Sequence, residues 1–440
     1  MTESRLRRRE LLGVVAAGYG AVAGCLTNRF RSEDVRSDRT DGSAVRNVEA
    51  YGIRGDGKTE VGAATHDLLD AVHREGGGVV YFPPGRYLFE RTPLVGDDTI
   101  LAGAGRSTVF EGPRPDGTHG GALLSNKGYD EPDYGGASNW EVRDVRIDSP
   151  DSNGIMPAHA ENVRLENLHG DAIRYHHVDV VSSKNVVVDG YRASRGGEGG
   201  SDAPMQFDAQ RSGTTSNGVW DGTGITLVAD DDTPTRRCRL TNFDIDPENG
   251  PNHGVQLHRG RHESIAITDG TISGCRFTAI RSDPGESMTD LRIARVSCLD
   301  NARGITLGHV ERGRRELAIS DVTIRSDDDV AAGSGVYAAG FDGSAISGVT
   351  VDGAFTNSTV FDDMVDLRMH NIRATGAEDQ AFRLRENVHA TLTSARAADC
   401  GGAGIYSGPG SSIAYGGVTF EDVGSEVVAD GEIREWIASS

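Results

Sequence analysis

Lysine is almost absent from this 440-residue sequence: it occurs only at positions 58, 127 and 184, and arginine supplies the rest of the 45 basic residues. Aspartate and glutamate number 66, so the formal net charge at pH 7 is −21. A nucleic-acid partner needs a basic face to meet its phosphates, and this charge argues against one. No apolar run reaches the roughly 18 residues of a membrane-spanning helix, which argues against an integral membrane protein.

Aromatic residues make up only 6 % of the sequence and proline contributes 14 residues, whereas glycine reaches 59. Glycine at about twice its usual share, without a Gly-x-y period, excludes a collagen-like chain. The aliphatic residues recur too regularly for a wholly disordered chain. At this length, one large β fold is as acceptable as two or three domains.

The five cysteines give no metal or redox signature, because none of them stands in Cys-x-x-Cys spacing. Cys238, Cys275, Cys298 and Cys400 are spread through β-like segments, and we expect them to be buried free thiols. Export would allow disulfides. Cys275 and Cys298 are 23 residues apart, near one repeat length, so stacking or a bridge between them stays open.

The first 25 residues have the composition of a targeting segment. Arginines at 7–9 precede a short glycine- and alanine-rich stretch, which ends in Val-Ala-Gly-Cys at 22–25. A basic region followed by so short an apolar run predicts a signal peptide. The paired arginines resemble a twin-arginine export signal, and Val-Ala-Gly-Cys resembles a lipobox. These resemblances imply that 1–25 is the signal and that Cys25 is lipidated and becomes the mature N-terminus.

The polar residues at 26–45 show no periodicity and are expected to form a flexible tether. The acidic, lysine-poor composition resembles that of proteins from halophilic archaea, whose charges are screened by concentrated salt. We therefore expect a haloarchaeal type of exported lipoprotein, at the cell surface or outside the cell. Its contact with the membrane would be only through the N-terminal lipid.

Short alternating strands recur through the rest of the chain. They begin near 163 and 186, and again near 265, 291 and 317, with spacings of 23 and 26 residues. A unit of this length is too short for a βαβ crossover, which needs about 30 residues or more. The pattern predicts an all-β fold, a right-handed parallel β-helix over 111–425, followed by a tail or cap at 426–440.

The segment before these repeats has its own order: a Tyr-Gly-x-x-Gly-Asp-Gly-x-Thr loop at 51–59, a helical pattern at 63–74, then Gly-Gly-x-Val-x-x-Pro-x-Gly-x-Tyr at 77–87. This order resembles the opening of the pectate-lyase superfamily (pectin-lyase-like proteins). It departs from the family where Thr-Glu-Val-Gly stands at 59–62. The resemblance implies that 46–110 caps the coil with a helix, and that a polysaccharide binds along one outer face.

A second strand of each repeat has the form small–aliphatic–x–apolar–x, at 172–176, 204–208, 254–258, 279–283 and 304–308. Because alternate side chains of a strand face opposite ways, the third and fifth positions should face outward. Stacked repeats about 4.8 Å apart would join these positions into a polar stripe. Its members are Arg174, His176, Gln206, Asp208, Gln256, His258, Arg281 and Asp283.

This stripe suggests β-elimination of an acidic polysaccharide. His258, in the middle of the stripe, is the candidate base that removes the C5 proton of a uronate, and Asp208 would orient it. Arg281 would neutralise the substrate carboxylate. The remaining substrate contacts are expected from Arg174, His176, Gln206, Gln256 and Asp283, and from Trp220, which could stack on a sugar or simply anchor the long excursion at 209–237.

Other functions stay open. In a hydrolase, Asp208 and Asp283, about 10 Å apart, would stand at the edge of the inverting range. A C5-epimerase would use similar groups, and a surface adhesin or polysaccharide-binding solenoid would need none of them. The polygalacturonase motifs are not matched as a set. No cofactor is certain, although Asp202, Asp208 and the aspartates at 230–232 could offer oxygens to Ca²⁺.

Overall fold

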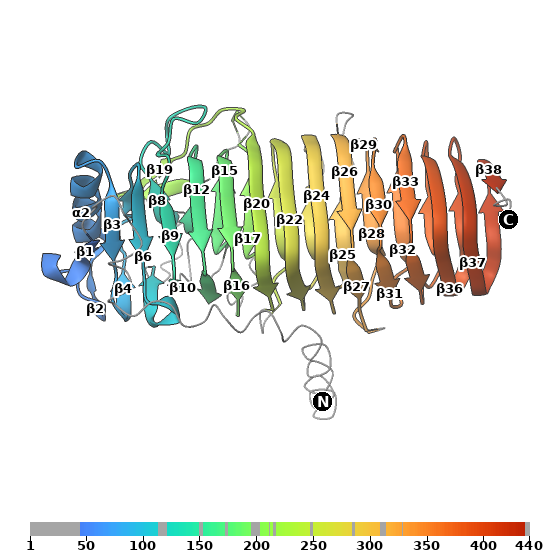
Figure 1. Ribbon diagram of the computed structural model, residues 1–440, viewed down its shortest axis with the longest axis horizontal. Coiled ribbons are helices and arrows are strands. Elements are labelled where there is room, and N and C mark those ends of the chain that lie inside the picture. Colours follow the sequence, from blue (N-terminus) through green and yellow to red (C-terminus); the bar gives the residue numbers. More distant parts are fainter. Residues whose placement is uncertain are drawn as a thin grey trace, which may run out of the picture. The chain divides into compact units, whose positions relative to one another are not determined.

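The computed structural model describes residues 45–112, 121–148, 153–171, 175–194, 203–210, 212–213, 217–246, 250–283, 287–308, 314–327 and 329–435. Nearly all of them belong to the second of two compact units, Arg46–Ser440. This unit is an all-β, right-handed parallel β-helix closed at one end by a helix, as the repeats predict (Figure 1). No helix in the described part of the chain is both long and apolar enough to cross a membrane.

Each turn of the coil adds one strand to each of three faces, and strands of successive turns pair in parallel. The first face consists of β1 (Val45–Asn47), β3 (Gly78–Tyr81), β6 (Thr99–Ala102), β9 (Glu141–Arg143), β12 (Glu161–Glu166), β15 (Lys184–Asp189), β20 (Thr235–Ile245), β22 (Arg261–Ser273), β24 (Ser287–Leu299), β26 (Arg314–Ser320), β30 (Ala345–Ser347), β33 (Leu367–His370), β36 (His389–Ser407), β37 (Ser412–Ala429) and β38 (Glu432–Glu435).

The second face shares the long strands β20, β22, β24, β36 and β37, which bend across the corner between the two faces. Its other strands are β2 (Asp56–Glu60), β4 (Gly85–Leu88), β7 (Thr108–Glu111), β10 (Arg146–Asp148), β13 (His169–Asp171), β16 (Arg192–Ala193), β27 (Thr323–Arg325), β31 (Thr350–Asp352) and β34 (Arg373–Thr375).

The third face carries the candidate site. It consists of β5 (Leu94–Val95), β8 (Gly121–Asn126), β11 (Asn153–Met156), β14 (Val178–Val181), β17 (Met205–Asp208), β21 (His253–His258), β23 (Thr278–Ser282), β25 (Arg303–Leu307), β28 (Ser334–Ala339), β32 (Asn357–Asp362) and β35 (Phe382–Leu384), and it ends on β36 and β37. A hairpin of β18 (Gly218–Trp220) and β19 (Ile225–Leu227) joins the third face through pairing of β18 with β8, and the short β29 (Phe341–Asp342) pairs with β26 of the first face.

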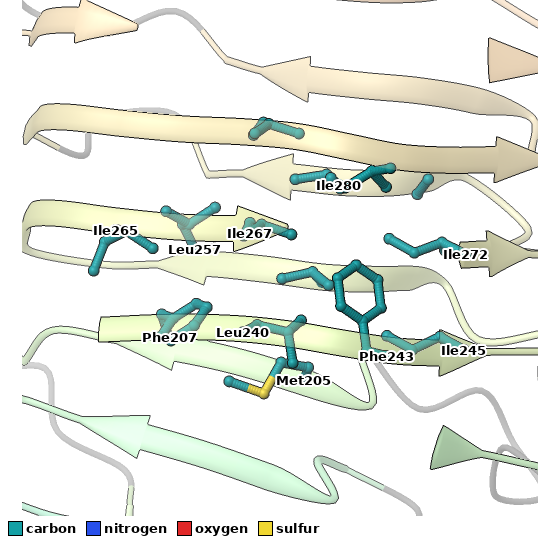
Figure 2. Close-up of a cluster of buried hydrophobic side chains, with 14 of the residues drawn as sticks. Met205, Phe207, Leu240, Phe243, Ile245, Leu257, Ile265, Ile267, Ile272 and Ile280 are labelled. Carbon is teal, nitrogen blue, oxygen red and sulfur yellow. The ribbon is translucent and has the colours of Figure 1, made fainter. Parts of the chain in front are cut away.

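The core is filled by stacked aliphatic and aromatic side chains from all three faces. Met205 and Phe207 of the third face meet Leu240 of the first and Phe243 near the corner, and the same pattern returns one turn later (Figure 2). The inward positions alternate with outward ones, as expected for strands. Each turn therefore buries its apolar side against its neighbours, as in other solenoids.

Residues with a left-handed backbone conformation at the corners of the coil account for much of its asparagine, aspartate and glycine content. Asn139, Asn162 and Asn185 adopt φ of 57°, 58° and 57° on successive turns. The side chain of each later asparagine donates to the one before it, at 3.1 Å and 2.7 Å. Asparagine tolerates this conformation better than most residues. The corner rows thus add hydrogen bonds between turns where the strands are interrupted.

Helix α2 (Gly62–Arg74) covers the end of the coil, where the sequence predicts a helix at 63–74 (Figure 1). It buries Leu68, Leu69 and Val72. Two short 3₁₀ helices, η4 (Val48–Tyr51) and η5 (Gly105–Ser107), belong to the same region. Covering the open end hides apolar side chains and strand edges that would otherwise invite association.

The described cysteines, Cys238, Cys275, Cys298 and Cys400, are free and buried, in agreement with the expectation of buried thiols. Burial raises the pKa of the Cys238 and Cys298 thiols to about 12. Cys275 and Cys298 do not form a bridge in this structure.

Gly270, in β22, supplies a test of this packing. A β-carbon at Gly270 would lie 2.5 Å from the ring of Phe243, although the glycine does not need a positive φ. We expect Gly270→Ala to reduce the free energy of unfolding by about 1–3 kcal/mol, since overpacking forces neighbours to shift. Gly224→Ala, where a β-carbon meets no atom within 4 Å, is the control and should be near neutral in chemical denaturation. Equal effects would contradict the packing argument.

Candidate functional site

Two rows of outward side chains run across neighbouring turns of the third face. In the first, which we call the Gln256 row, Asp179, Gln206, Gln256 and Arg281 are backbone partners in sequence. In the second, the His258 row, Val181, Asp208 and His258 are partners. Asp283 continues the His258 row, because its backbone N–H donates to Leu257 at 3.2 Å.

His258 lies between two carboxyl groups. Its Nδ1 is 3.7 Å from Asp208 Oδ1, and its Nε2 is 3.2 Å from Asp283 Oδ2. Nδ1 is buried, although a quarter of the side chain is exposed. Burial, together with the nearby charge of Arg259, lowers the pKa of His258 to about 3. The imidazole is therefore neutral at neutral pH.

Asp208 and Asp179 form a buried pair of carboxyl groups. Asp208 Oδ2 accepts hydrogen bonds from Gln210 at 2.9 Å and Asn217 at 2.8 Å. Asp179 accepts from Gln206 at 3.1 Å and from Asn153 at 3.0 Å. Burial raises the pKa of Asp179 to about 7. Burial and the neighbouring Asp179 raise the pKa of Asp208 well above its ordinary range, so Asp208 does not give His258 a full negative charge.

Arg281 joins the two rows. One terminal nitrogen is 2.7 Å from Asp283 Oδ1, and the other is 2.7 Å from Nε2 of His253. Gln256 also donates to Asp283, at 3.1 Å. The ring of Phe277, about half exposed, lies against His253 with centroids 6.0 Å apart. Carboxylate, imidazole, guanidinium and an exposed aromatic ring thus meet on two adjacent turns, those of β21 and β23.

The structure brings His258, Asp208, Arg281, Asp283, Gln206 and Gln256 together, as the stripe predicts. It does not place His176 in the stripe, because β14 at Val178–Val181 pairs with β17. His176 is buried and its Nδ1 contacts the carbonyl oxygen of Ala203 at 2.6 Å. Arg174 lies outside the described residues. Asp179 therefore occupies the position expected for Arg174, and Val181 that expected for His176.

Asp179 and Phe277 were not among the predicted site residues. The alternation of Val178, Asp179 and Val180 was a readable signal, since it is the pattern of a strand with one polar outward position. Phe277 directly precedes the repeat motif, and an exposed aromatic residue at the edge of a polar stripe was the signal for it.

The excursion at 209–237 covers part of the third face. Val219 and Val228 pack on Ala122, Met156 and Val181, which makes a small apolar cluster outside the coil. The buried ring of His159 contacts the carbonyl oxygens of Asp133 and Ala229, at 2.7 Å and 3.2 Å, so it bridges two covering loops. Asp208, only 1 % exposed, lies under this cover rather than on an open surface.

Trp220 lies away from His258. Its strand β18 pairs with β8, and its backbone N–H donates to Thr92 at 3.1 Å. Strand β8 is three turns from β17, about 14 Å along the coil. Trp220 thus anchors the excursion at a distance from the stripe's centre.

The aspartates at 230–232 serve the covering loops. Asp230 accepts from the backbone of Gly213 at 2.7 Å, Asp231 from Asp133 at 2.8 Å and Asp232 from Ser212 at 3.1 Å. Among the residues that the structure describes, no group of three or more His, Cys, Asp or Glu side chains is arranged to hold a metal ion. Asp202 lies outside those residues.

A family model described as "Rhamnogalacturonase A/epimerase, pectate lyase-like" matches residues 45–280, more than half of the chain and all of the strands that build the site up to Ile280. The chain belongs to this family. Alginate lyase 7 of Azotobacter vinelandii is 31 % identical over 111 residues, a match that covers 23 % of this chain and only 12 % of that protein.

Solved structures with low sequence identity share the fold. Tailspike protein 3 of bacteriophage CBA120 aligns with a TM-score of 0.57 and 13 % identity, over all of this chain and 69 % of that one. The Family 28 exopolygalacturonase of Yersinia enterocolitica aligns with a TM-score of 0.53 and 10 % identity, over 89 % of this chain and 78 % of that one. The adhesin PfbA of Streptococcus pneumoniae aligns with a TM-score of 0.52 and 14 % identity, over 90 % of this chain and 99 % of that one.

The raised pKa of Asp179 predicts a pH dependence of stability. The folded state holds the carboxyl proton of Asp179 more tightly than the unfolded chain does. The protonated carboxyl group therefore stabilises the fold fully below about pH 4, and this stabilisation is lost as the pH rises through about 7. Asp179→Asn cannot ionise and should lose less stability over this interval, with a difference on the order of 4 kcal/mol at most. Thermal midpoints across this pH range measure it.

Asp366→Asn, at a half-exposed aspartate of the same chain, is the control for this experiment. The interpretation is wrong if Asp179→Asn and the wild type lose stability in parallel as the pH rises.

Proposed function

We propose that this protein cleaves an acidic polysaccharide by β-elimination on the third face. The observation that carries the proposal is the neutral imidazole of His258, held against Asp283 and next to Arg281. Base and guanidinium are the two groups that removal of a proton adjacent to a carboxylate requires. Membership of a pectate lyase-like family supports a carbohydrate substrate.

The geometry indicates which atoms would act. Because Nδ1 of His258 is buried against Asp208, Nε2 and Asp283 are the proton-accepting pair. Arg281 would bind the uronate carboxylate and stabilise the charge that develops when the C5 proton leaves. The C5–H electrons form the C4–C5 double bond, the C4–O4 bond breaks, and the leaving oxygen takes a proton from the pair. Asp208 is a positioning residue for the ring.

Hydrolysis is the second candidate, because a protonated Asp208 and the Arg281-paired Asp283 stand two turns apart. Their contacts with the two nitrogens of His258 place the carboxyl oxygens at most about 9 Å apart, within the spacing of inverting glycosidases. The burial of Asp208 under Gln210 and Asn217 argues against it, since a general acid must reach the glycosidic oxygen. An epimerase would share the first proton transfer and return a proton to C5 without breaking the chain.

Incubation with polygalacturonate, polymannuronate, polyguluronate and rhamnogalacturonan tests the proposal. Elimination gives unsaturated uronates that absorb in the ultraviolet, whereas hydrolysis gives reducing ends without that absorbance. Epimerisation in heavy water would place deuterium at C5 without shortening the chain. Absence of all three products would favour a binding solenoid, as in the adhesin that shares this fold.

His258→Ala should lower the elimination rate by about 10²–10⁴-fold, the usual cost of losing a general base. The thermal midpoint should change little, because the side chain faces outward from the core. His370→Ala, at an exposed histidine of β33 on the first face, is the matched control and should retain activity. Unfolding of the His258 variant, or full activity, would contradict the assigned role.

We also propose that the protein is exported by a twin-arginine route and held at the cell surface by a lipid on Cys25. The supporting features are the arginines at 7–9 and Val-Ala-Gly-Cys at 22–25. Mass spectrometry of the native protein should show loss of residues 1–24 and a lipid mass. Cys25→Ser should release the protein into the medium, and a variant that stays with the membrane fraction would contradict lipidation.

A further inference from the structure

The Gln256 row continues far beyond the candidate site. After Arg281 it passes, turn by turn, through Thr306, Tyr337, Val360, Arg383, Tyr406 and Val428. From Gln206 onward, none of these described positions carries a carboxylate, and the charged members are both arginines.

Arg383 is the most informative member of this extension. Its guanidinium lies over the ring of Tyr406, 5.8 Å from the centroid, and its Nε is buried without a hydrogen-bond acceptor. Among the described residues it forms no ion pair, whereas its neighbour Arg385 binds Asp362 at 3.1 Å. A guanidinium that is held in place but not neutralised is suited to an external carboxylate.

The surroundings of Arg383 are partly apolar. Val360, the preceding member of the row, is only 4 % exposed and lies between the turns of Tyr337 and Arg383. Tyr406 is half-buried, and its hydroxyl donates to Asp430 at 2.8 Å, which fixes the ring. An ordered aromatic ring beside a guanidinium can meet the apolar face and the carboxylate of one uronate.

We propose that the Gln256 row, from Arg281 to Tyr406, is a binding track for an anionic polysaccharide chain, and that Arg383 and Tyr406 form its distal uronate subsite. Arg383 is four turns from Arg281, about 19 Å along the coil. The substrate chain would then run along the coil axis from His258 toward the C-terminal turns. The identity of the sugar as a uronate rests on the proposed function; the track itself does not.

The test compares Arg383→Met, which keeps an apolar stem over Val360 but removes the charge, with Arg396→Met. Arg396 carries the same group on the second face, where it binds Glu421. Kinetics are measured on galacturonate and mannuronate oligomers from the disaccharide to the octasaccharide. Arg383→Met should raise KM for the longest oligomers roughly tenfold or more and leave kcat unchanged.

For oligomers too short to reach 19 Å, the KM of Arg383→Met should equal that of the wild type. Tyr406→Ala should show the same dependence on length, and Arg396→Met should show none. If Arg383→Met behaves like Arg396→Met at every length, the track is wrong while the catalytic proposal stands. If it weakens short and long oligomers alike, the distal position of the subsite is wrong.

Electrophoresis of the full-length protein through gels that contain polygalacturonate or alginate separates the two proposals. If the wild type turns over no polymer but is retarded in a way that Arg383→Met abolishes, the track is correct and the elimination chemistry is not. If wild type, Arg383→Met and Arg396→Met migrate alike, the track is overturned whatever the activity.

Discussion

The parallel register between successive turns is the constraint on which the rest of this protein depends. Backbone hydrogen bonds set neighbouring turns about 4.8 Å apart, so a side chain at one position stands directly beside its counterparts above and below. The pairing of Phe207 with Leu257 aligns the core, and the same register aligns Asp208 with His258 outside it. The neighbours of a functional side chain on this scaffold therefore depend on its position along the strand as well as on the turn that carries it.

The same stacking that brings the groups of the site together also buries two carboxyl groups where their ionised forms are destabilised. Stacking brings Asp179 and Asp208 into the same buried region, where two ionised carboxylates would repel without water to screen them. Burial raises the pKa of both groups, and burial together with the charge of Arg259 keeps His258, which lies between Asp208 and Asp283, neutral. Gln210 and Asn217 of the covering excursion donate hydrogen bonds to Asp208, which partly offset the rise in its pKa.

The sequence was sufficient for the fold because the apolar period survives in it. The repeats near 265, 291 and 317 are register partners, as their spacing of 26 predicts. The motif at 172–176 failed because its five-residue pattern is short enough to occur by chance, and β14, with Val178 and Val180 buried, satisfies the core better. Pairing with the strands of the preceding and following turns, β11 and β17, therefore determined that β14, and not the motif at 172–176, forms the strand of this turn.

The site was predictable only in part, for a different reason. His258, Asp208 and Arg281 could be found because they lie inside regular motifs. The burial of Asp208 could not be predicted, because it depends on where an irregular loop folds back onto the coil. The path of such a loop does not follow from the repeat pattern of the sequence. In the sequence, Asp179 resembles the other outward-facing aspartates of an acidic chain, because its burial and its contacts are visible only in the structure.

Acidity itself becomes informative once the rows are known. A strongly negative protein repels a polyanion over most of its surface, so a polyanionic substrate would be admitted only where carboxylates are missing. The Gln256 row is such a place, with Arg281 and Arg383 as its charged members from Gln206 onward. Negative charge elsewhere would then guide the polymer as effectively as the arginines hold it, because wrong placements are penalised along the other faces. On this view the net charge of −21 and the choice of an anionic substrate are compatible, and the distribution of charge among rows decides where binding occurs.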